Sequence, residues 1–195
     1  MALAPIDIKV SPDDYLRHEL TSEIKHEYDN GYVVAMVGAS RRHNLIALGL
    51  ATRIRSHLKG RPCRTYISDM KLRIRTQGND LFYYPDLMVS CDSNPPSEYY
   101  EEQPVLIIEV LSPSTETRDK LEKLSAYTRI PSVKEYLTVS QERFEVQRYS
   151  LSDGSAQLTE YGEDDSLLLE SIGLTLSVRE VYEDVLDELR QAGES

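Results

Sequence analysis

The chain of 195 residues contains little cysteine and no long apolar run. Its two cysteines, Cys63 and Cys91, are too few and too far apart in the sequence to indicate a disulfide framework or a zinc site, so we expect reduced thiols. No apolar run approaches the roughly 20 residues of a membrane span, and residues 1–10 lack the basic and apolar regions of a signal peptide. These absences predict a cytoplasmic protein without a membrane segment.

The composition also lacks the biases of disordered, collagenous or low-complexity chains. Hydrophobic residues make up 40% and charged residues 28% of the chain, and no internal repeat is visible. A chain of this size buries about 70% of its unfolded surface when it folds, so it needs neither a disulfide nor a structural metal. The length predicts a single domain over residues 1–195.

The net charge of −11 at pH 7 is not typical of a DNA-binding protein, but it is unevenly distributed. Residues 41–75 contain ten Lys and Arg against one acid, whereas residues 151–195 contain two Arg against twelve acids. This asymmetry permits a basic face on an acidic body, although a solvated helix face followed by an alternating strand would have the same composition. Nucleic acid therefore remains open as a partner, although no dedicated recognition module is visible.

Caps, turns and apolar spacing predict an α+β protein with a mixed central β-sheet flanked by helices. We expect helices near residues 12–20, 41–59, 116–128 and 177–189, a hairpin over 25–37, and strands near 63–75, 81–90, 104–111, 135–140, 143–150, 156–161 and 167–170. Residues 63–75 alternate in polarity and predict one half-buried strand. The continuous apolar run Pro104–Leu111 is typical of a central strand that is covered on both faces.

Two acids stand out in this pattern, Glu109 within the apolar run and Asp86 in the neighbouring apolar stretch. An unpaired carboxylate costs several kcal/mol to bury, so Glu109 needs a cation or hydrogen bonds. Acids on adjacent strands could converge on Mg²⁺, and Lys120 or Lys123 on the following helix could orient a water or stabilise phosphoryl charge. Alternatively, Asp86 caps a turn, Glu109 is a satisfied core acid and both lysines lie at the surface.

The string "YYPDLMV … PVLIIEVLSPSTETRDKLEKLSAYTRIPSVKEYLTVS" resembles the Uma-two family of proposed restriction endonucleases, which belongs to the PD-(D/E)xK nuclease superfamily. The upstream "KHEYDNGYVVAM" is similar to the Glu-containing entry strand of that family, and "RRHNLIALGLATRIRSHL" to its His-bearing helix. The most specific part is "EVLSPST" followed by a helix with Lys123 and Tyr127. The resemblance covers roughly residues 10–182.

The resemblance implies a restriction-endonuclease-like core in which Asp86 and Glu109 bind Mg²⁺ or Mn²⁺. It also implies that DNA is the substrate. The general superfamily signature would have a lysine at the position of Leu111, and the family pattern moves it to Lys123 on the following helix, with Lys120 as the alternative. A long, flexible ammonium side chain can reach one point from more than one backbone position. Lys123 shares a helical face with Tyr127, which we expect to be an apolar anchor.

Further candidate residues lie upstream. Glu27 matches the upstream acid of the family, which would bind a second metal or hold a water, although it could be a surface acid beside a turn. His43 matches the helix histidine, which would contact phosphate, although a structural role is the alternative. Within the basic segment, Arg73 and Arg75 are candidate DNA contacts.

These features predict a metal-dependent endonuclease that hydrolyses DNA phosphodiester bonds, with Asp86, Glu109, Lys123 and Glu27 as the catalytic set. One alternative is a catalytically weak nucleic-acid-binding or accessory protein on the same fold, and another is a protein-interaction module that uses the acidic C-terminal part. Because double-strand cleavage generally needs two active sites, we expect a homodimer.

Overall fold

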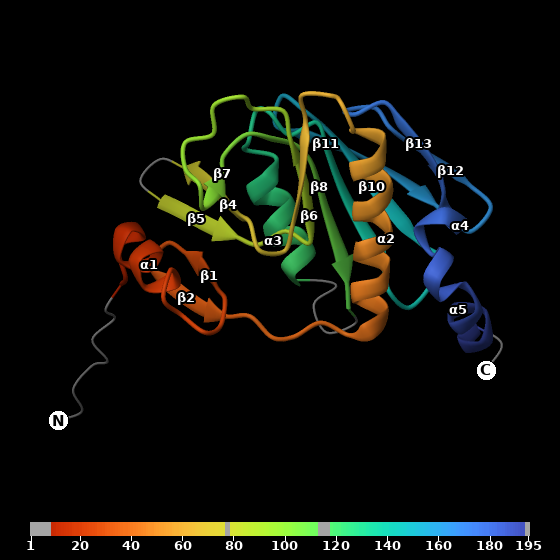
Figure 1. Cartoon of the computed structure of the whole chain (residues 1–195), viewed down its shortest axis with the longest axis horizontal. Helices are drawn as coiled ribbons and strands as arrows, with labels where there is room; N and C mark the ends of the chain where they lie inside the picture. Colours follow the sequence, from red (N-terminus) through yellow and green to blue (C-terminus); the bar gives the residue numbers. More distant parts are fainter. Residues whose placement is uncertain (1–8, 77–78, 113–117, 194–195) are drawn as a thin grey trace.

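The computed structural model describes residues 9–76, 79–112 and 118–193, in which helices pack on three β-sheets (Figure 1). The helices are α1 (Pro12–Glu19), α2 (Arg41–His57), α3 (Arg118–Tyr127), α4 (Val178–Val181) and α5 (Leu186–Gly193), with a 3-10 turn η1 (Glu183–Val185). The strands are β1 (His26–Asp29), β2 (Tyr32–Ala35), β3 (Arg64–Ile67), β4 (Lys71–Thr76), β5 (Asn79–Tyr83), β6 (Leu87–Ser90), β7 (Tyr100–Glu101), β8 (Pro104–Leu111), β9 (Glu135–Ser140), β10 (Val146–Ser152), β11 (Ser155–Tyr161), β12 (Ser166–Leu169) and β13 (Leu174–Ser177).

Two larger sheets make up most of the structure. The six-stranded sheet has the order β11-β10-β9-β8-β6-β3, with β8 and β9 parallel. The five-stranded sheet has the order β2-β1-β5-β4-β7, with β4 and β7 parallel. Strands β12 and β13 form a separate antiparallel pair. The predicted α+β class with mixed sheets and flanking helices is thereby confirmed.

The prediction of one strand over residues 63–75 is wrong, because a turn at Ser68–Met70 divides the segment. The amides of Asp69 and Met70 both donate to the carbonyl of Ile67, at 2.5 and 3.0 Å. Strand β3 then pairs with β6, and β4 with β5, in different sheets. The stretch 81–90 is likewise divided, at Pro85. Alternating polarity continues across the first break, so the pattern does not reveal it, whereas Pro85 interrupts the apolar stretch 81–90 and is a visible signal of the second break.

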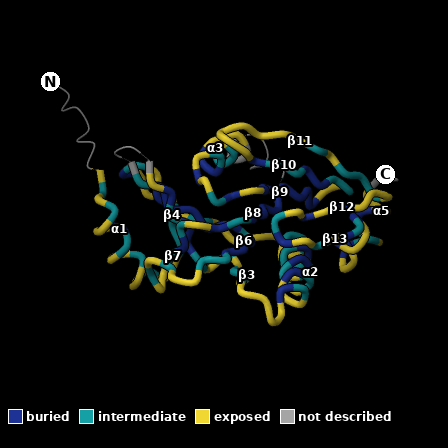
Figure 2. Tube along the Cα trace, turned by 90° about the horizontal axis from the view of Figure 1, so that it is seen from above, coloured by how far each residue is buried: buried dark blue, intermediate teal, exposed yellow. Residues whose placement is uncertain are grey.

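Strand β8 lies in the buried middle of the molecule (Figure 2). Leu106, Ile108 and Val110 belong to the cluster that includes the apolar face of α2, whereas Ile107 belongs to the cluster that includes Tyr127 of α3. Because side chains alternate along a strand, Glu109 points to the same side as Ile107. The expected central strand is therefore covered on both faces, and its acid faces α3.

The N-terminal part adds a small aromatic layer. The ring of Tyr15 on α1 lies 5.0 Å from that of Tyr28 on β1 and 5.2 Å from that of Phe82 on β5. The turn between β1 and β2 places Asn30 and Gly31 at φ angles of 48° and 101°, which confirms the hairpin expected from Asn-Gly. This layer holds α1 against the five-stranded sheet.

Within the described part of the chain, the structure contains no helix with the length and apolarity needed to cross a membrane.

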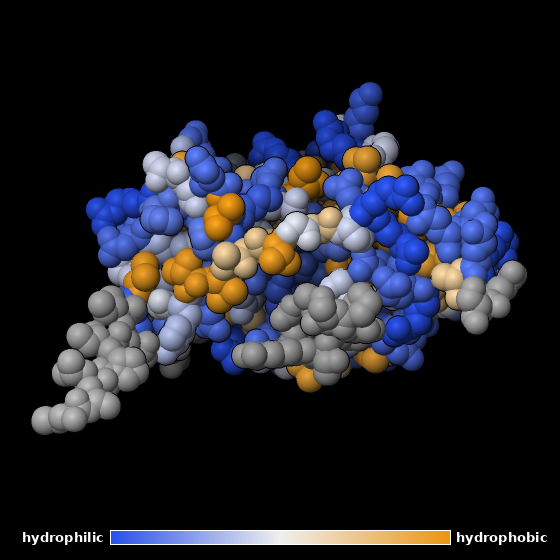
Figure 3. All heavy atoms as spheres, turned by 90° about the horizontal axis from the view of Figure 1, so that it is seen from below, coloured by the Kyte–Doolittle hydropathy of each residue, from blue (hydrophilic) through white to orange (hydrophobic). Residues whose placement is uncertain are grey.

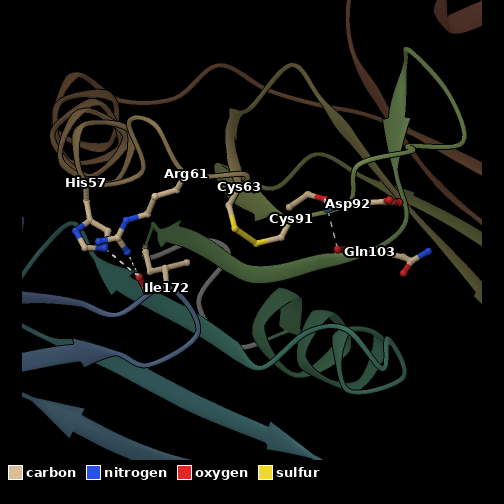
Figure 4. Close-up of a disulfide and its surroundings, with 8 residues drawn as sticks. His57, Arg61, Cys63, Cys91, Asp92, Gln103 and Ile172 are labelled. Atoms are coloured by element: carbon tan, nitrogen blue, oxygen red, sulfur yellow. Dashed lines mark hydrogen bonds between the residues drawn. A yellow bond between two sulfur atoms is a disulfide. The ribbon is translucent and has the colours of Figure 1, made fainter.

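The expectation of reduced thiols is wrong, because Cys63 and Cys91 form a disulfide (Figure 4). Antiparallel pairing of β3 with β6 sets Arg64 opposite Ser90, so the cysteines just outside this pair face each other with Cα atoms 4.0 Å apart. Their separation of 28 residues along the chain therefore says nothing about their distance in space. The bond fastens the start of β3 to the end of β6.

Replacing both Cys63 and Cys91 with Ser should lower the free energy of unfolding by about 3–4 kcal/mol, because the cross-link restricts the unfolded chain. Urea unfolding without reductant measures the difference. In denaturant, a maleimide should label no thiol before reduction and both cysteines afterwards. Labelling of two thiols in the unreduced protein, with equal stability of wild type and variant, would show that the disulfide does not form.

Candidate active site

The site is built around Glu109, a buried carboxylate near the end of β8. Its Oε1 atom accepts hydrogen bonds from Lys123 Nζ at 3.1 Å and from the Tyr127 hydroxyl at 2.8 Å. Its Oε2 atom accepts from the Asp86 amide at 3.4 Å. Only 8% of the Glu109 side chain is exposed, so these donors replace the water that the carboxylate loses on folding.

Asp86 lies beside Glu109 because the chain leaves the five-stranded sheet at Pro85 and enters the six-stranded sheet at Leu87. Leu87 pairs with Ile108 in antiparallel register, so the position before it falls opposite Glu109. The Asp86 Oδ2 atom accepts from the Val110 amide at 2.7 Å, which ties the acid to the end of β8. The break at Pro85 thus places two carboxylates on neighbouring strands at the same end of the sheet.

Lys123 and Glu27, both half-buried, complete the cluster. Lys123 Nζ lies 3.1 Å from Glu27 Oε1 on β1 as well as 3.1 Å from Glu109 Oε1, and it lies 5.5 Å from the centre of the Tyr83 ring. The Glu27 contact is an ion pair without hydrogen-bond alignment, because this buried oxygen has no hydrogen-bond donor among the described residues. The ammonium therefore joins the acids of β1 and β8 from α3.

His43 reaches the same site from the first turn of α2. The Ser40 side chain caps this helix by accepting from the His43 amide, and His43 Nε2 lies 3.1 Å from Asp86 Oδ2. The imidazole and the Val110 amide share one oxygen of Asp86. His43 is thus placed to orient the carboxylate and to lie at the border of the site.

The site holds more negative than positive charge. Burial raises the pKa of the Glu109 carboxyl to about 7; Lys123 opposes this rise, and the nearby Asp86 and Glu27 add to it. Burial would lower the pKa of Lys123, but the two glutamates outweigh it and raise that pKa, so the ammonium keeps its proton. Burial also acts to lower the pKa of His43, yet its contact with Asp86 raises it overall.

The structure brings together five of the sequence-predicted residues and leaves two elsewhere. Glu27, His43, Asp86, Glu109 and Lys123 form the cluster described above. Arg73 and Arg75 instead lie on β4, where Arg73 pairs with Asp80 at 2.9 Å and Arg75 with Glu102 at 2.8 Å. Their contact with DNA stays a prediction. The Lys120 side chain, the alternative to Lys123, lies outside the described residues.

Tyr127 has a role that the sequence did not reveal. We expected an apolar anchor, and its ring does pack in the core with Tyr136 at 5.0 Å between ring centres. Its hydroxyl, however, donates to Glu109, and burial raises the pKa of Tyr127 well above its ordinary value, so the group stays a donor. The four-residue step from Lys123 to Tyr127 was the available signal, because both side chains share one helical face.

The donor set fits a hard divalent cation. Carboxylate oxygens are the ligands that Mg²⁺ uses in proteins, usually one or two of them together with several waters. Asp86 and Glu109 supply two such groups, and the described hydrogen bonds of the Asp86 carboxylate involve its Oδ2 atom, which leaves Oδ1 to face an ion. Burial is the main cause of the raised pKa of Glu109, and the neighbouring acids Asp86 and Glu27 add to it; a bound cation would offset both effects.

Comparison with solved structures identifies the class of fold. The crystal structure of a protein from Anabaena variabilis, described as "a putative nuclease belonging to DUF820", aligns with a TM-score of 0.72 and 19% sequence identity. The alignment covers 89% of this chain and 98% of the other. The fold is therefore restriction-endonuclease-like, as the resemblance implied.

Comparison of sequences identifies the family. Residues 12–179 match the Uma2 (Uma-two) family, described as "Putative restriction endonuclease". The Synechocystis protein "Uncharacterized protein slr1290" is 38% identical over 176 residues, which cover 89% of this chain and 92% of the relative. Another Synechocystis protein, "Uncharacterized protein sll1609", is 32% identical over 151 residues, covering 75% and 84%. This chain belongs to the Uma2 family, and the predicted resemblance is confirmed.

The pKa of Glu109 predicts how the stability of the metal-free protein depends on pH. The pKa of Glu109 is ordinarily 4.5 and is about 7 in the folded protein. Between pH 4.5 and 7 the folded state therefore keeps a proton on Glu109 that the unfolded state has lost. The free energy of unfolding should therefore fall as pH rises from about 4.5 to 7, by up to about 3 kcal/mol from this group.

Urea unfolding across this pH range, in the presence of a chelator, measures the effect. The stability of Glu109→Gln relative to wild type should rise with pH, because glutamine has no proton to lose. Glu98→Gln, which changes an exposed glutamate, serves as the control and should follow the wild-type profile. Parallel profiles for wild type and Glu109→Gln would show that Glu109 ionises normally in the folded protein.

Proposed function

We propose that this protein is a Mg²⁺-dependent endonuclease that hydrolyses phosphodiester bonds in DNA, with Mn²⁺ as an alternative ion. The observation that carries the proposal is the convergence of Asp86 and Glu109 with Lys123, whose ammonium lies 3.1 Å from Glu109. Membership of the Uma2 family and the nuclease-like fold support the reaction class. The chain is further proposed to act as a single nuclease domain.

Asp86 and Glu109 would hold the ion. When bound, such an ion polarises a phosphoryl oxygen and lowers the pKa of a bound water. Lys123 keeps its proton because two glutamates raise its pKa, so it acts as a charged hydrogen-bond donor and not as a general base. Its role is to orient the attacking water or to stabilise the charge that develops on the phosphate.

The remaining residues position this set. Tyr127 donates to the same Glu109 oxygen as Lys123 and thereby directs Oε2 of that carboxylate toward Asp86. His43 orients Asp86, and although burial acts against it, the contact with Asp86 raises the pKa of His43 overall, which favours the charged imidazolium at the border of the site. Glu27 keeps Lys123 in place from the opposite side, and we propose it as the upstream acid that holds a water or a second ion.

A nuclease assay on plasmid and oligonucleotide DNA tests the proposal. Wild type should cleave with Mg²⁺ or Mn²⁺ and not with EDTA, and Asp86→Asn, Glu109→Gln and Lys123→Met should each lower the rate at least about 100-fold, because each removes a charge aimed at the reacting phosphate. The matched control is Lys134→Met, an exposed lysine outside the site, which should cleave as wild type does.

Circular dichroism and a metal-dependent rise in melting temperature separate lost chemistry from lost fold. Lys123→Met should retain both, since Asp86 and Glu109 remain. DNA binding without cleavage by wild type would instead favour a catalytically weak accessory protein. If wild type neither cleaves nor binds DNA, the proposed function is contradicted altogether.

For the DNA partner, Arg75 is the stronger of the two proposed contacts on β4. Its side chain is 59% exposed, whereas that of Arg73 is 15% exposed between Asp80 and Glu102. A long side chain that is already paired on both sides has little reach toward phosphate. We therefore propose Arg75, together with His43 at the border of the site, as the residues that contact DNA.

We also propose that the protein is a homodimer, and the edge strand β2 supports this. All four residues of β2 are exposed, including Val33 and Val34 at 39% and 60%, and Val37 just beyond is 91% exposed. Figure 3 shows hydrophobic side chains gathered at this end of the lower face. An unpaired, apolar strand edge invites a second strand, and a two-fold axis would pair β2 with its own copy.

Sedimentation velocity tests the homodimer. Wild type should sediment as a dimer, and Val34→Lys should sediment as a monomer because it sets a charge on the shared edge. The matched control is Leu158→Lys on β11, an exposed leucine on the outer strand of the other sheet, which should remain dimeric. A monomeric wild type would contradict the proposal.

The cytoplasm remains the proposed location, and the disulfide is the observation against it. Disulfides persist in oxidising compartments and are rare in the cytosol. The thiol labelling described above, applied to protein from freshly lysed, acid-quenched cells, decides between the two. Labelled cysteines support the cytoplasm, and protected cysteines contradict it.

A further inference from the structure

Three side chains of metal-binding type meet on the N-terminal layer, away from Asp86 and Glu109. His18 and Glu19 end α1, and His26 begins β1; one ligand atom from each lies within 4.8 Å of the other two. The rings of His18 and His26 are edge to face, with centres 5.9 Å apart. Figure 1 shows α1 beside β1 and β2 at one end of the molecule. The mechanism proposed above uses none of these residues.

The carboxylate of Glu19 is fixed in a way that leaves one oxygen for a ligand. Its Oε1 atom accepts from the His26 amide and from the Tyr84 hydroxyl, each at 2.9 Å. Its Oε2 atom lies 3.0 Å from His26 Nδ1. Only 2% of the Glu19 side chain is exposed. Hydrogen bonds to the outer oxygen of a carboxylate are what orient metal-binding acids in proteins.

The spacing suits a small tetrahedral ion. Zinc binds imidazole nitrogen at about 2.0–2.1 Å and carboxylate oxygen at about 2.0–2.2 Å, which separates neighbouring ligand atoms by about 3.3 Å. Glu19 Oε2 and His26 Nδ1 are already 3.0 Å apart. His18 is exposed, so its ring can approach by a side-chain rotation without disturbing the core.

The chemistry of the donors separates this cluster from the acidic one. Two imidazoles and one carboxylate suit Zn²⁺ and related transition-metal ions, whereas Mg²⁺ prefers oxygen ligands alone. Two lysines lie nearby, because Nζ of Lys71 is 5.3 Å and Nζ of Lys25 is 5.8 Å from the centre of the Tyr84 ring.

We propose that His18, Glu19 and His26 form a Zn²⁺-class binding site that fastens α1 to β1, with a water completing the ion's coordination. The residue after His26 is Glu27, which points to the opposite side of β1, toward Lys123. An ion at this site would therefore hold the strand that carries Glu27. Its role is structural, and it does not depend on whether the protein cleaves DNA.

Titration of the chelator-treated full chain with Co²⁺ tests the site, because tetrahedral Co²⁺ absorbs visible light and octahedral Co²⁺ hardly does. One equivalent of Co²⁺ should give the tetrahedral spectrum, and added Zn²⁺ should abolish it. His18→Ala should weaken Co²⁺ binding at least about tenfold, because a ligand is lost. As His18 is exposed, this variant should keep the wild-type circular dichroism.

The controls use the other candidate site. Asp86→Asn with Glu109→Gln should retain the Co²⁺ spectrum, and so should His43→Ala, which removes a histidine from the acidic cluster. Equal Co²⁺ affinity of wild type and His18→Ala would overturn the proposal and leave Glu19 and His26 as a hydrogen-bonded pair. Loss of the spectrum in the Asp86 and Glu109 variant would overturn it as well. A failed nuclease assay with an intact Co²⁺ spectrum would contradict only the proposed function.

Discussion

The ammonium of Lys123 between Glu109 and Glu27 is the interaction on which the arrangement of the candidate site depends. Glu109 stands on a strand that is buried on both faces, where an unpaired carboxylate would cost several kcal/mol. Lys123 from α3 and Glu27 from β1 meet there at 3.1 Å contacts, so one buried charge links the central strand, a helix and the second sheet. Apolar residues at these positions would often give a fold of equal or greater stability, so stability alone does not explain the ion pair.

The division of the chain between two sheets makes this meeting possible. Strands β3 and β6 lie in one sheet and β4 and β5 in the other, so the chain crosses between them at Met70 and again at Pro85. The second crossing delivers Asp86 to the position opposite Glu109. The basic and acidic parts of the chain lie side by side in the structure, because arginines of α2 form ion pairs with glutamates of the acidic C-terminal part. These ion pairs are Arg41–Glu188, Arg42–Glu188 and Arg53–Glu183.

The sequence was sufficient to predict elements that depend on neighbouring residues, such as helix caps, tight turns and apolar strands. The Ser177 capping box starts α4, the Asn30-Gly31 turn closes a hairpin, and the apolar run at Pro104 forms the central strand. The acids of the site were visible because a carboxylate in an apolar strand is costly. Contacts that depend on the pairing register of two strands could not be predicted from the sequence. The disulfide depends on which residues of β3 and β6 face each other, which composition and spacing do not specify.

The hydroxyl of Tyr127 was missed for a related reason. A tyrosine on an apolar helix face is typical of core packing. The four-residue step from Lys123 indicated only that the two side chains share a face, and the distance to Glu109 shows that the hydroxyl is also a donor. The crossing at Met70 was missed because alternating polarity continues through it, and at Pro85 the proline indicated an interruption but not a change of sheet. The family resemblance, and not the spacing alone, favoured Lys123 over Lys120, since the two lysines stand one turn apart on the same helix.

The central claim is that Asp86 and Glu109 form one divalent-cation site next to Lys123. Anomalous diffraction from a crystal soaked in Mn²⁺ tests it most directly. The account predicts a manganese peak between the two carboxylates, with bonds of about 2.0–2.3 Å to an oxygen of each. A well-ordered site without such a peak, with manganese bound only at His18, Glu19 and His26, would contradict it.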